Sequence, residues 1–217
     1  MHQVQLDHCI LVALEPLYSI IYLLKNNPEE AVMTYRKVPF SKELYIERED
    51  FQEEANKKFF RLTLGTEVRL KNAYIIKGES VIKDENGTIT EIHCTYDTDS
   101  RSGSGTEASQ RKVKGTIHWV SINHAVPAEI RVYDRLFSSE SPDGNKEIDF
   151  KEFINPNSLE IITGYVEPSL QSSKDLDQFQ FQRLGYFCVD KESSPSNLVF
   201  NKTVGLRDTW AKVESKE

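Results

Sequence analysis

The sequence predicts an all-β protein made of two consecutive antiparallel β-barrels with few short helices. Three features support this prediction: short segments that alternate apolar and polar residues recur along most of the chain, turn residues separate them, and helical patterns are brief. A chain of 217 residues accommodates two domains of about 100 residues each. We expect the first barrel at residues 1–114 and the second at 115–217, with a soft boundary across which strands can be exchanged.

The first half of the chain holds the clearest strand patterns. Residues 43–48 alternate, and in 68–76 the side chains of Val68, Leu70 and Tyr74 share one face by period two. Residues 80–96 predict a β-hairpin that turns at Asn86-Gly87, because both central positions of a type I′ turn need a positive φ.

The second half continues the same pattern with shorter strands. Further strands are expected at 116–120, 130–137, 159–166, 179–189 and 197–203. Single helical turns are expected at 28–32 and 49–56, where acidic residues stand near the start and suit the helix dipole. The Gly/Ser-rich segment 99–109 is typical of a mobile loop and lies near the boundary between the barrels.

The charge of the chain limits its possible partners. A formal net charge of −7 excludes a protein that holds nucleic acid by a global positive field, so any RNA contact must be local. Cations do cluster, at Lys57, Lys58, Arg61, Arg69 and Lys71, and again at Arg111, Lys112 and Lys114. Such clusters are more often solvated faces than binding sites.

The sequence contains no pattern of an independent catalytic or metal centre. Cys9, Cys94 and Cys188 are widely spaced without a C-x-x-C pair, so neither a disulfide framework nor a zinc site is indicated, and a reducing cytoplasm fits best. His118 stands among apolar residues beside Trp119, and both are expected in the core. The apolar stretch 10–24 is interrupted by Glu15-Pro16 and is too short to span a bilayer, so no membrane partner is expected.

One segment leaves two readings open. In 179–183 the residues Phe179 and Phe181 alternate with Gln180 and Gln182 and precede Arg183. In a strand, the rings fill the core and the amides face outward. Alternatively, unstacked RNA bases need amide and guanidinium donors for their edges and flat groups for their faces.

Several segments in order resemble the C-terminal region of the glutaminyl-tRNA synthetase family. The resemblance begins near Arg36, covers close to 180 residues, and rests on segments that include 45–51, 68–74, 111–120, 133–137, 179–187 and 200–212. It implies two barrels related to ribosomal protein L25 that grip an anticodon loop beside a separate catalytic domain. The H-x-G-H and K-M-S-K-S signatures of that catalytic domain have no counterpart here, so no catalytic residue is expected.

The same resemblance implies which residues contact RNA. Arg61 closes an N-K-x-x-x-R run, Arg69 precedes the L-x-N-A-Y pattern, and Lys71 stands where the family usually has Arg. Lys keeps the charge but loses the planar fork that binds an acceptor with two hydrogen bonds. The remaining four expected contacts are Gln180, Arg183, Arg207 and Thr209. An Arg that the family carries shortly before its A-V-[LI]-[DE]-P motif is absent, because Cys9-Ile10-Leu11 stands there.

The resemblance also implies an activity and partners. The parent enzyme attaches glutamine to its tRNA with ATP and magnesium, whereas this part holds no cofactor or metal and supplies recognition. Its expected partners are the tRNA-Gln anticodon loop and the catalytic domain of the same enzyme, in a cytoplasmic monomer. Two alternatives remain: a glutamyl-type synthetase, which shares the barrels, and a free-standing L25-like protein bound to ribosomal RNA.

Overall fold

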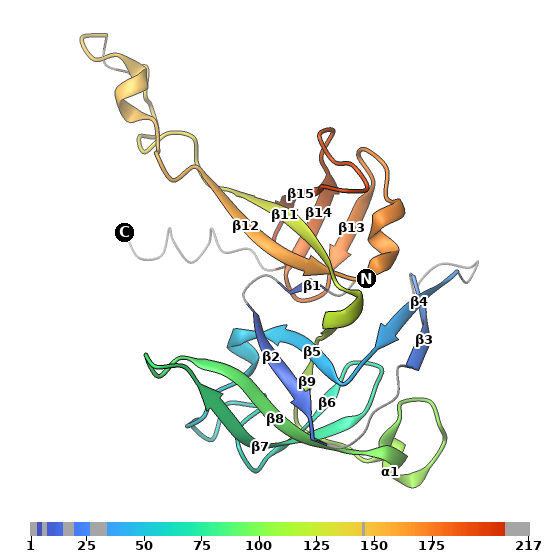
Figure 1. Cartoon of the computed structure of the whole chain (residues 1–217). Helices are drawn as coiled ribbons and strands as arrows, with labels where there is room; N and C mark the ends of the chain where they lie inside the picture. Colours follow the sequence, from blue (N-terminus) through green and yellow to red (C-terminus); the bar gives the residue numbers. More distant parts are fainter. Residues whose placement is uncertain (1–3, 6–7, 15–19, 27–33, 145, 207–217) are drawn as a thin grey trace.

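A computed structural model describes residues 4–5, 8–14, 20–26, 34–144 and 146–206, and it confirms the all-β prediction (Figure 1). Two large curled sheets dominate, each with its own hydrophobic core. We call the seven-stranded sheet the first barrel and the six-stranded sheet the second barrel. A two-stranded sheet completes the fold.

The first barrel is built around aromatic and branched side chains. Its strands, in spatial order, are β10 (Val120–Ser121), β5 (Glu43–Glu47), β2 (His8–Ala13), β8 (Ile89–Asp97), β7 (Ile75–Lys83), β6 (Glu67–Leu70) and β9 (Thr116–Ile117). Trp119 lies at the centre of the core, in edge-to-face contact with Phe40 at 4.8 Å between ring centroids. Its indole nitrogen donates to the Lys71 carbonyl at 2.9 Å.

The two edges of this sheet are joined by the chain itself. The edge strands β9 and β10 are separated only by His118 and Trp119, both buried. A two-residue connection holds the edges close together, so the sheet curls back on itself and few ladder groups stay exposed.

The second barrel takes its strands from both ends of the chain. Their spatial order is β1 (Val4–Gln5), β12 (Leu159–Val166), β11 (Val126–Tyr133), β15 (Leu198–Val204), β14 (Gly185–Val189) and β13 (Gln178–Phe181). Phe181, Phe187 and Phe200 form its core, with Phe181 and Phe187 stacked at 4.3 Å. Between β11 and β12 a long arm extends away from the barrel (Figure 1).

Small elements fill the connections. The third sheet is a hairpin of β3 (Ile20–Lys25) and β4 (Tyr35–Phe40). The helix α1 covers Glu107–Gln110, and short 3-10 helices occur at Arg48–Asp50, Thr98–Ser100, Ile122–His124, Phe150–Phe153 and Pro168–Ser172. The helical turn expected at 28–32 lies outside the described residues.

Several details differ from the expectations. The strand expected at 179–189 is two strands, β13 and β14, because the chain turns between them with Arg183 at a φ of 67°. The strand expected at 116–120 is interrupted between β9 and β10. The strand expected at 68–76 is two strands, because Asn72 has a φ of 59° and ends β6 in a turn. The hairpin of β7 and β8 forms, but only Gly87 has a positive φ, so its turn is not of type I′. Pairing is parallel in β2·β8, β6·β9 and β11·β15, while the other ladders are antiparallel.

The two barrels draw strands from overlapping parts of the sequence and contact each other. β1 pairs with β12 in the second barrel, whereas β9 pairs with β6 and β10 with β5 in the first. Across the junction, Arg36 Nε donates to Glu167 Oε2 at 2.7 Å with both side chains buried, and Tyr45 stacks on Tyr165 at 4.3 Å. The boundary between the two domains at residues 114 and 115 stays a prediction. The sheet of the first barrel includes β9 and β10, which reach Ser121.

Candidate nucleic-acid interface

Two arginines from different barrels meet on one buried carboxylate. Asp50 Oδ1 accepts from Arg61 Nη1 at 2.8 Å and from Arg183 Nη2 at 2.7 Å. The Asp50 side chain is fully buried, whereas Arg61 and Arg183 keep 34% and 27% of their side chains exposed. The guanidinium groups therefore reach the surface side by side at the junction of the barrels.

Local backbone structure places each arginine. Leu184 N–H donates to the Phe181 carbonyl at 3.0 Å, which closes a tight turn between β13 and β14 with Arg183 at a φ of 67°. A non-glycine residue in this region costs about 1 kcal/mol or more, and such outliers concentrate at functional sites. On the first barrel, Leu62 N–H donates to the Asp50 carbonyl at 3.0 Å, which fixes the segment that carries Arg61.

Glu49 covers the arginine pair on the solvent side. Its Oε1 lies 2.9 Å from Arg61 Nη1 and 3.4 Å from Arg183 Nη2, with 69% of the side chain exposed. The hydrogen bond from Arg61 lowers the pKa of Glu49. Burial raises the pKa of Asp50, and the hydrogen bond and charge of Arg183 oppose that effect.

His118 lies beneath the same cations. It is 4% exposed, and its pKa is lowered to about 3, first by burial and then by the charges of Arg183 and Lys71. A hydrogen bond with the Gln182 side chain partly opposes this shift. The imidazole is therefore neutral at physiological pH, and it can pack against cations without repelling them.

The remaining sequence-predicted residues divide into two groups. Gln180 is half-buried on β13, which ends at Phe181, directly before the turn that carries Gln182 and Arg183. Lys71 follows β6, with its backbone N–H donating to the Ile117 carbonyl at 2.9 Å. Arg61, Lys71, Gln180 and Arg183 thus belong to elements that meet at the barrel junction.

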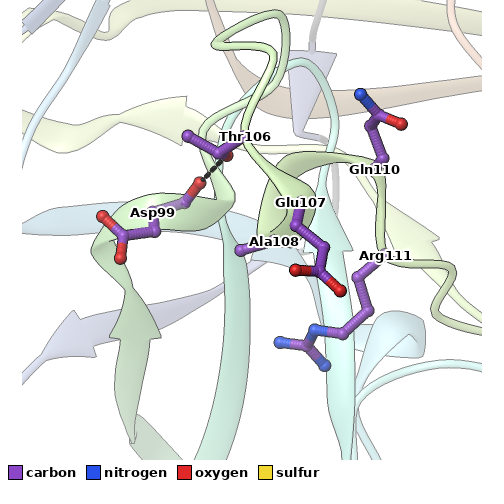
Figure 2. Close-up of a pocket in the computed structure, with 6 residues that line it drawn as sticks. All are labelled: Asp99, Thr106, Glu107, Ala108, Gln110 and Arg111. Atoms are coloured by element: carbon purple, nitrogen blue, oxygen red, sulfur yellow. Dashed lines mark hydrogen bonds between the residues drawn. The ribbon is translucent and has the colours of Figure 1, made fainter.

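Arg69 lies in a different environment. Its guanidinium donates to the backbone carbonyls of Ser100 at 2.8 Å and Ser109 at 3.0 Å, so it holds the 99–109 loop against β6. The hollow beside this loop is lined by residues that include Asp99, Thr106 and Arg111, with Thr106 bonded to the Asp99 carbonyl (Figure 2). Arg69 as an RNA contact stays a prediction.

Other features bear on the interface. Arg207 and Thr209 lie outside the described residues. Lys114 Nζ lies 5.8 Å from the centre of the Phe60 ring, so the two cation clusters of the sequence are neighbours in space. Within residues 4–5, 8–14, 20–26, 34–144 and 146–206, no helix is long and apolar enough to cross a membrane, and no group of three or more metal-binding side chains occurs.

The sequence patterns did not identify Glu49 or Asp50 as part of this site, whereas Gln182 stood in the segment with amides suited to RNA bases. Asp50 stood in an acidic run that reads as solvated surface, and only its burial distinguishes it. His118 was expected in the core, where it is, but the electrostatic effect on it of cations from two barrels could not be seen from its apolar neighbours.

The two β-barrels and the cation cluster at their junction define a class of protein, the nucleic-acid-binding proteins built from β-barrels. Two models of the tRNA synthetases class I (E and Q) anti-codon binding domain match the chain, at residues 7–97 and 116–190. The chain belongs to this family of anticodon-binding domains.

Similar proteins from other organisms belong to the same family. The glutamine–tRNA ligases of Vibrio parahaemolyticus and Proteus mirabilis are 56% identical over 89% and 88% of this chain, and that of Photobacterium profundum is 53% identical over 89%. In each case the match covers 34% of the relative. The chain therefore spans about a third of the length of the curated relatives it matches.

Proposed function

We propose that this chain is the part of a glutamine–tRNA ligase that recognises the anticodon loop of tRNA-Gln, with Arg61, Lys71, Gln180 and Arg183 in contact with RNA. The main support is the meeting of Arg61 and Arg183, one from each barrel, on the buried carboxylate of Asp50. Two fixed guanidinium forks can bind base edges or phosphates, while nearby amides select among bases.

Arg69, Arg207 and Thr209 complete the proposed set of contacts. The parent enzyme would supply the catalytic domain, ATP and magnesium, and would act in the cytoplasm as a monomer. In that enzyme, the barrels contribute recognition at a distance from the chemistry. The acidic net charge of −7 implies few phosphate contacts, so the isolated chain should bind RNA with about micromolar or weaker affinity at physiological salt.

The test compares two RNA hairpins. Fluorescence anisotropy would measure binding of the tRNA-Gln anticodon stem-loop and of the same loop with a changed central base, at two salt concentrations. Arg183→Ala and Gln180→Ala should each lower affinity for the matched loop by roughly tenfold or more. Each variant loses the proposed hydrogen bond from its side chain to the edge of an RNA base, which contributes about 1.5 kcal/mol to binding. The changed loop should lose much less.

Matched controls separate base reading from charge. Lys151→Ala removes one exposed cation on the distant arm, and Gln178→Ala removes an exposed amide on β13. Both should leave affinity nearly unchanged. Equal losses on the two loops for Arg183→Ala and Gln180→Ala would rule out base reading by these residues.

A further inference from the structure

Glu49 and Asp50 are neighbours in sequence but lie on different sides of the same arginine pair. Asp50 contacts Arg61 and Arg183 from the fully buried side, and the largely exposed Glu49 contacts them from solvent. Two positive and two negative charges therefore meet in the free chain. This arginine pair therefore carries no net excess of positive charge.

The inner carboxylate is fixed in place. Asp50 Oδ1 accepts hydrogen bonds from both arginines. The other carboxylate oxygen, Oδ2, is buried and has no hydrogen-bond partner among the described residues. A buried carboxylate with one oxygen unpaired depends on its cations, because removing them leaves an uncompensated buried charge. Asp50 thus contacts both guanidinium groups from the buried side and orients them.

The outer carboxylate is held weakly. Glu49 is 69% exposed, and ion pairs of this kind contribute little because water screens them. Its Oε1 nevertheless contacts both guanidinium groups, at 2.9 and 3.4 Å. One oxygen atom therefore already occupies the position where an acceptor could bind both arginines.

We propose that Oε1 of Glu49 occupies the place that an oxygen acceptor of RNA takes on the arginine pair, and that Asp50 positions the pair for that acceptor. This inference rests on the proposed function. Glu49 competes with the RNA, so an acceptor must reach both arginines to displace it. Glu49 is in this sense a specificity-determining residue, and the acceptor is either a phosphate oxygen or a base carbonyl.

The experiment measures RNA affinity of the full chain with Glu49→Gln, which keeps the shape of the side chain and removes the competing charge. We expect the variant to bind the matched anticodon stem-loop roughly threefold to tenfold more tightly, the effect of releasing two exposed ion pairs. Glu54→Gln removes the same charge from an exposed residue nearby and should change affinity less than twofold. Asp50→Asn should weaken binding instead.

The two RNA sources give different results. If the acceptor is a phosphate oxygen, Glu49→Gln tightens the matched and changed loops equally and steepens the salt dependence. If it is a base carbonyl, the matched loop gains more than the changed loop. An equal effect of Glu49→Gln and Glu54→Gln, or a Glu49→Gln variant that binds more weakly, would overturn the inference.

A second measurement needs no RNA. Inorganic phosphate would be titrated into the wild-type chain and the Glu49→Gln variant while NMR follows the guanidinium Nε–H signals of Arg61 and Arg183. Saturable shifts at lower phosphate concentration in the variant are expected, and identical titrations would overturn the inference. A wild-type chain that fails to distinguish the two loops would refute the proposed function, whereas the phosphate titration judges Glu49 by itself.

Discussion

The buried ion pair between Arg36 and Glu167 should hold the two barrels together, and Glu167→Gln tests it. Arg36 on β4 and Glu167 at the end of β12 are 8% and 1% exposed, and their Nε and Oε2 atoms lie 2.7 Å apart. The substitution keeps the shape of the side chain but removes the carboxylate charge that faces the Arg36 guanidinium, which also donates to the Lys25 carbonyl at 2.8 Å. Breaking a pair at this depth costs about 3–5 kcal/mol, and the remaining amide oxygen places the expected loss near the lower end.

Urea unfolding measures this loss. Far-UV circular dichroism and tryptophan fluorescence would be followed together, because two barrels can unfold in separate steps. A loss of about 3 kcal/mol corresponds to a shift of roughly 1–2 M in the urea midpoint. Glu160→Gln, on an exposed position of β12, is the control and should shift the midpoint little. Indistinguishable midpoints for Glu167→Gln and Glu160→Gln would refute the proposed role of the pair.

Three further predictions concern the first barrel. Trp119→Phe should cost about 2–4 kcal/mol in urea unfolding, because it leaves a cavity and removes the donor to the Lys71 carbonyl; exposed Phe60→Leu should cost far less, and equal costs would contradict this. His118 has a pKa of about 3 in the folded chain and stays neutral at pH values where the unfolded chain binds a proton on this residue. The free energy of unfolding should therefore fall as pH drops below about 6.5, by up to about 1.4 kcal/mol per pH unit. His118→Gln should reduce this pH dependence, and an unchanged dependence would show that other groups cause it. Gly115→Ala would place a methyl group against the Phe60 carbonyl, so it should lower the free energy of unfolding by about 1–3 kcal/mol and displace the segment that carries Arg61. Thr116→Ala, at the exposed next residue, is the control. Equal urea midpoints for the two variants would show that the Phe60 segment moves aside at no cost.

Local patterns predicted most strands, since alternation needs only neighbouring residues. The strand at 159–166 agrees with the structure residue for residue. The error at 68–76 has a local cause: Asn72 takes a left-handed conformation, which alternation cannot detect. The pairing of β1 with β12 and the parallel ladders join distant segments, so nothing in a short window of sequence indicates them.

The candidate site was predictable only in part. The family resemblance singled out Arg61 and Arg183, and the structure places both on Asp50. The resemblance gave no reason to separate Arg69 from them, although its guanidinium is bonded to loop carbonyls. The roles of Glu49 and Asp50 depend on burial and on contacts across the junction, which an acidic run in the sequence does not reveal.

The exchange of strands between the barrels has a consequence for biosynthesis. β1 is synthesised well before its partner β12, which begins only at Leu159. The first barrel must wait for β9 and β10, which are made after all its other strands. Such distant pairings fold slowly and leave strand edges unpaired during synthesis, when aggregation competes. A truncation at any single point between the barrels would remove a strand from one of them, so the two barrels should be expressed, purified and stored as one piece.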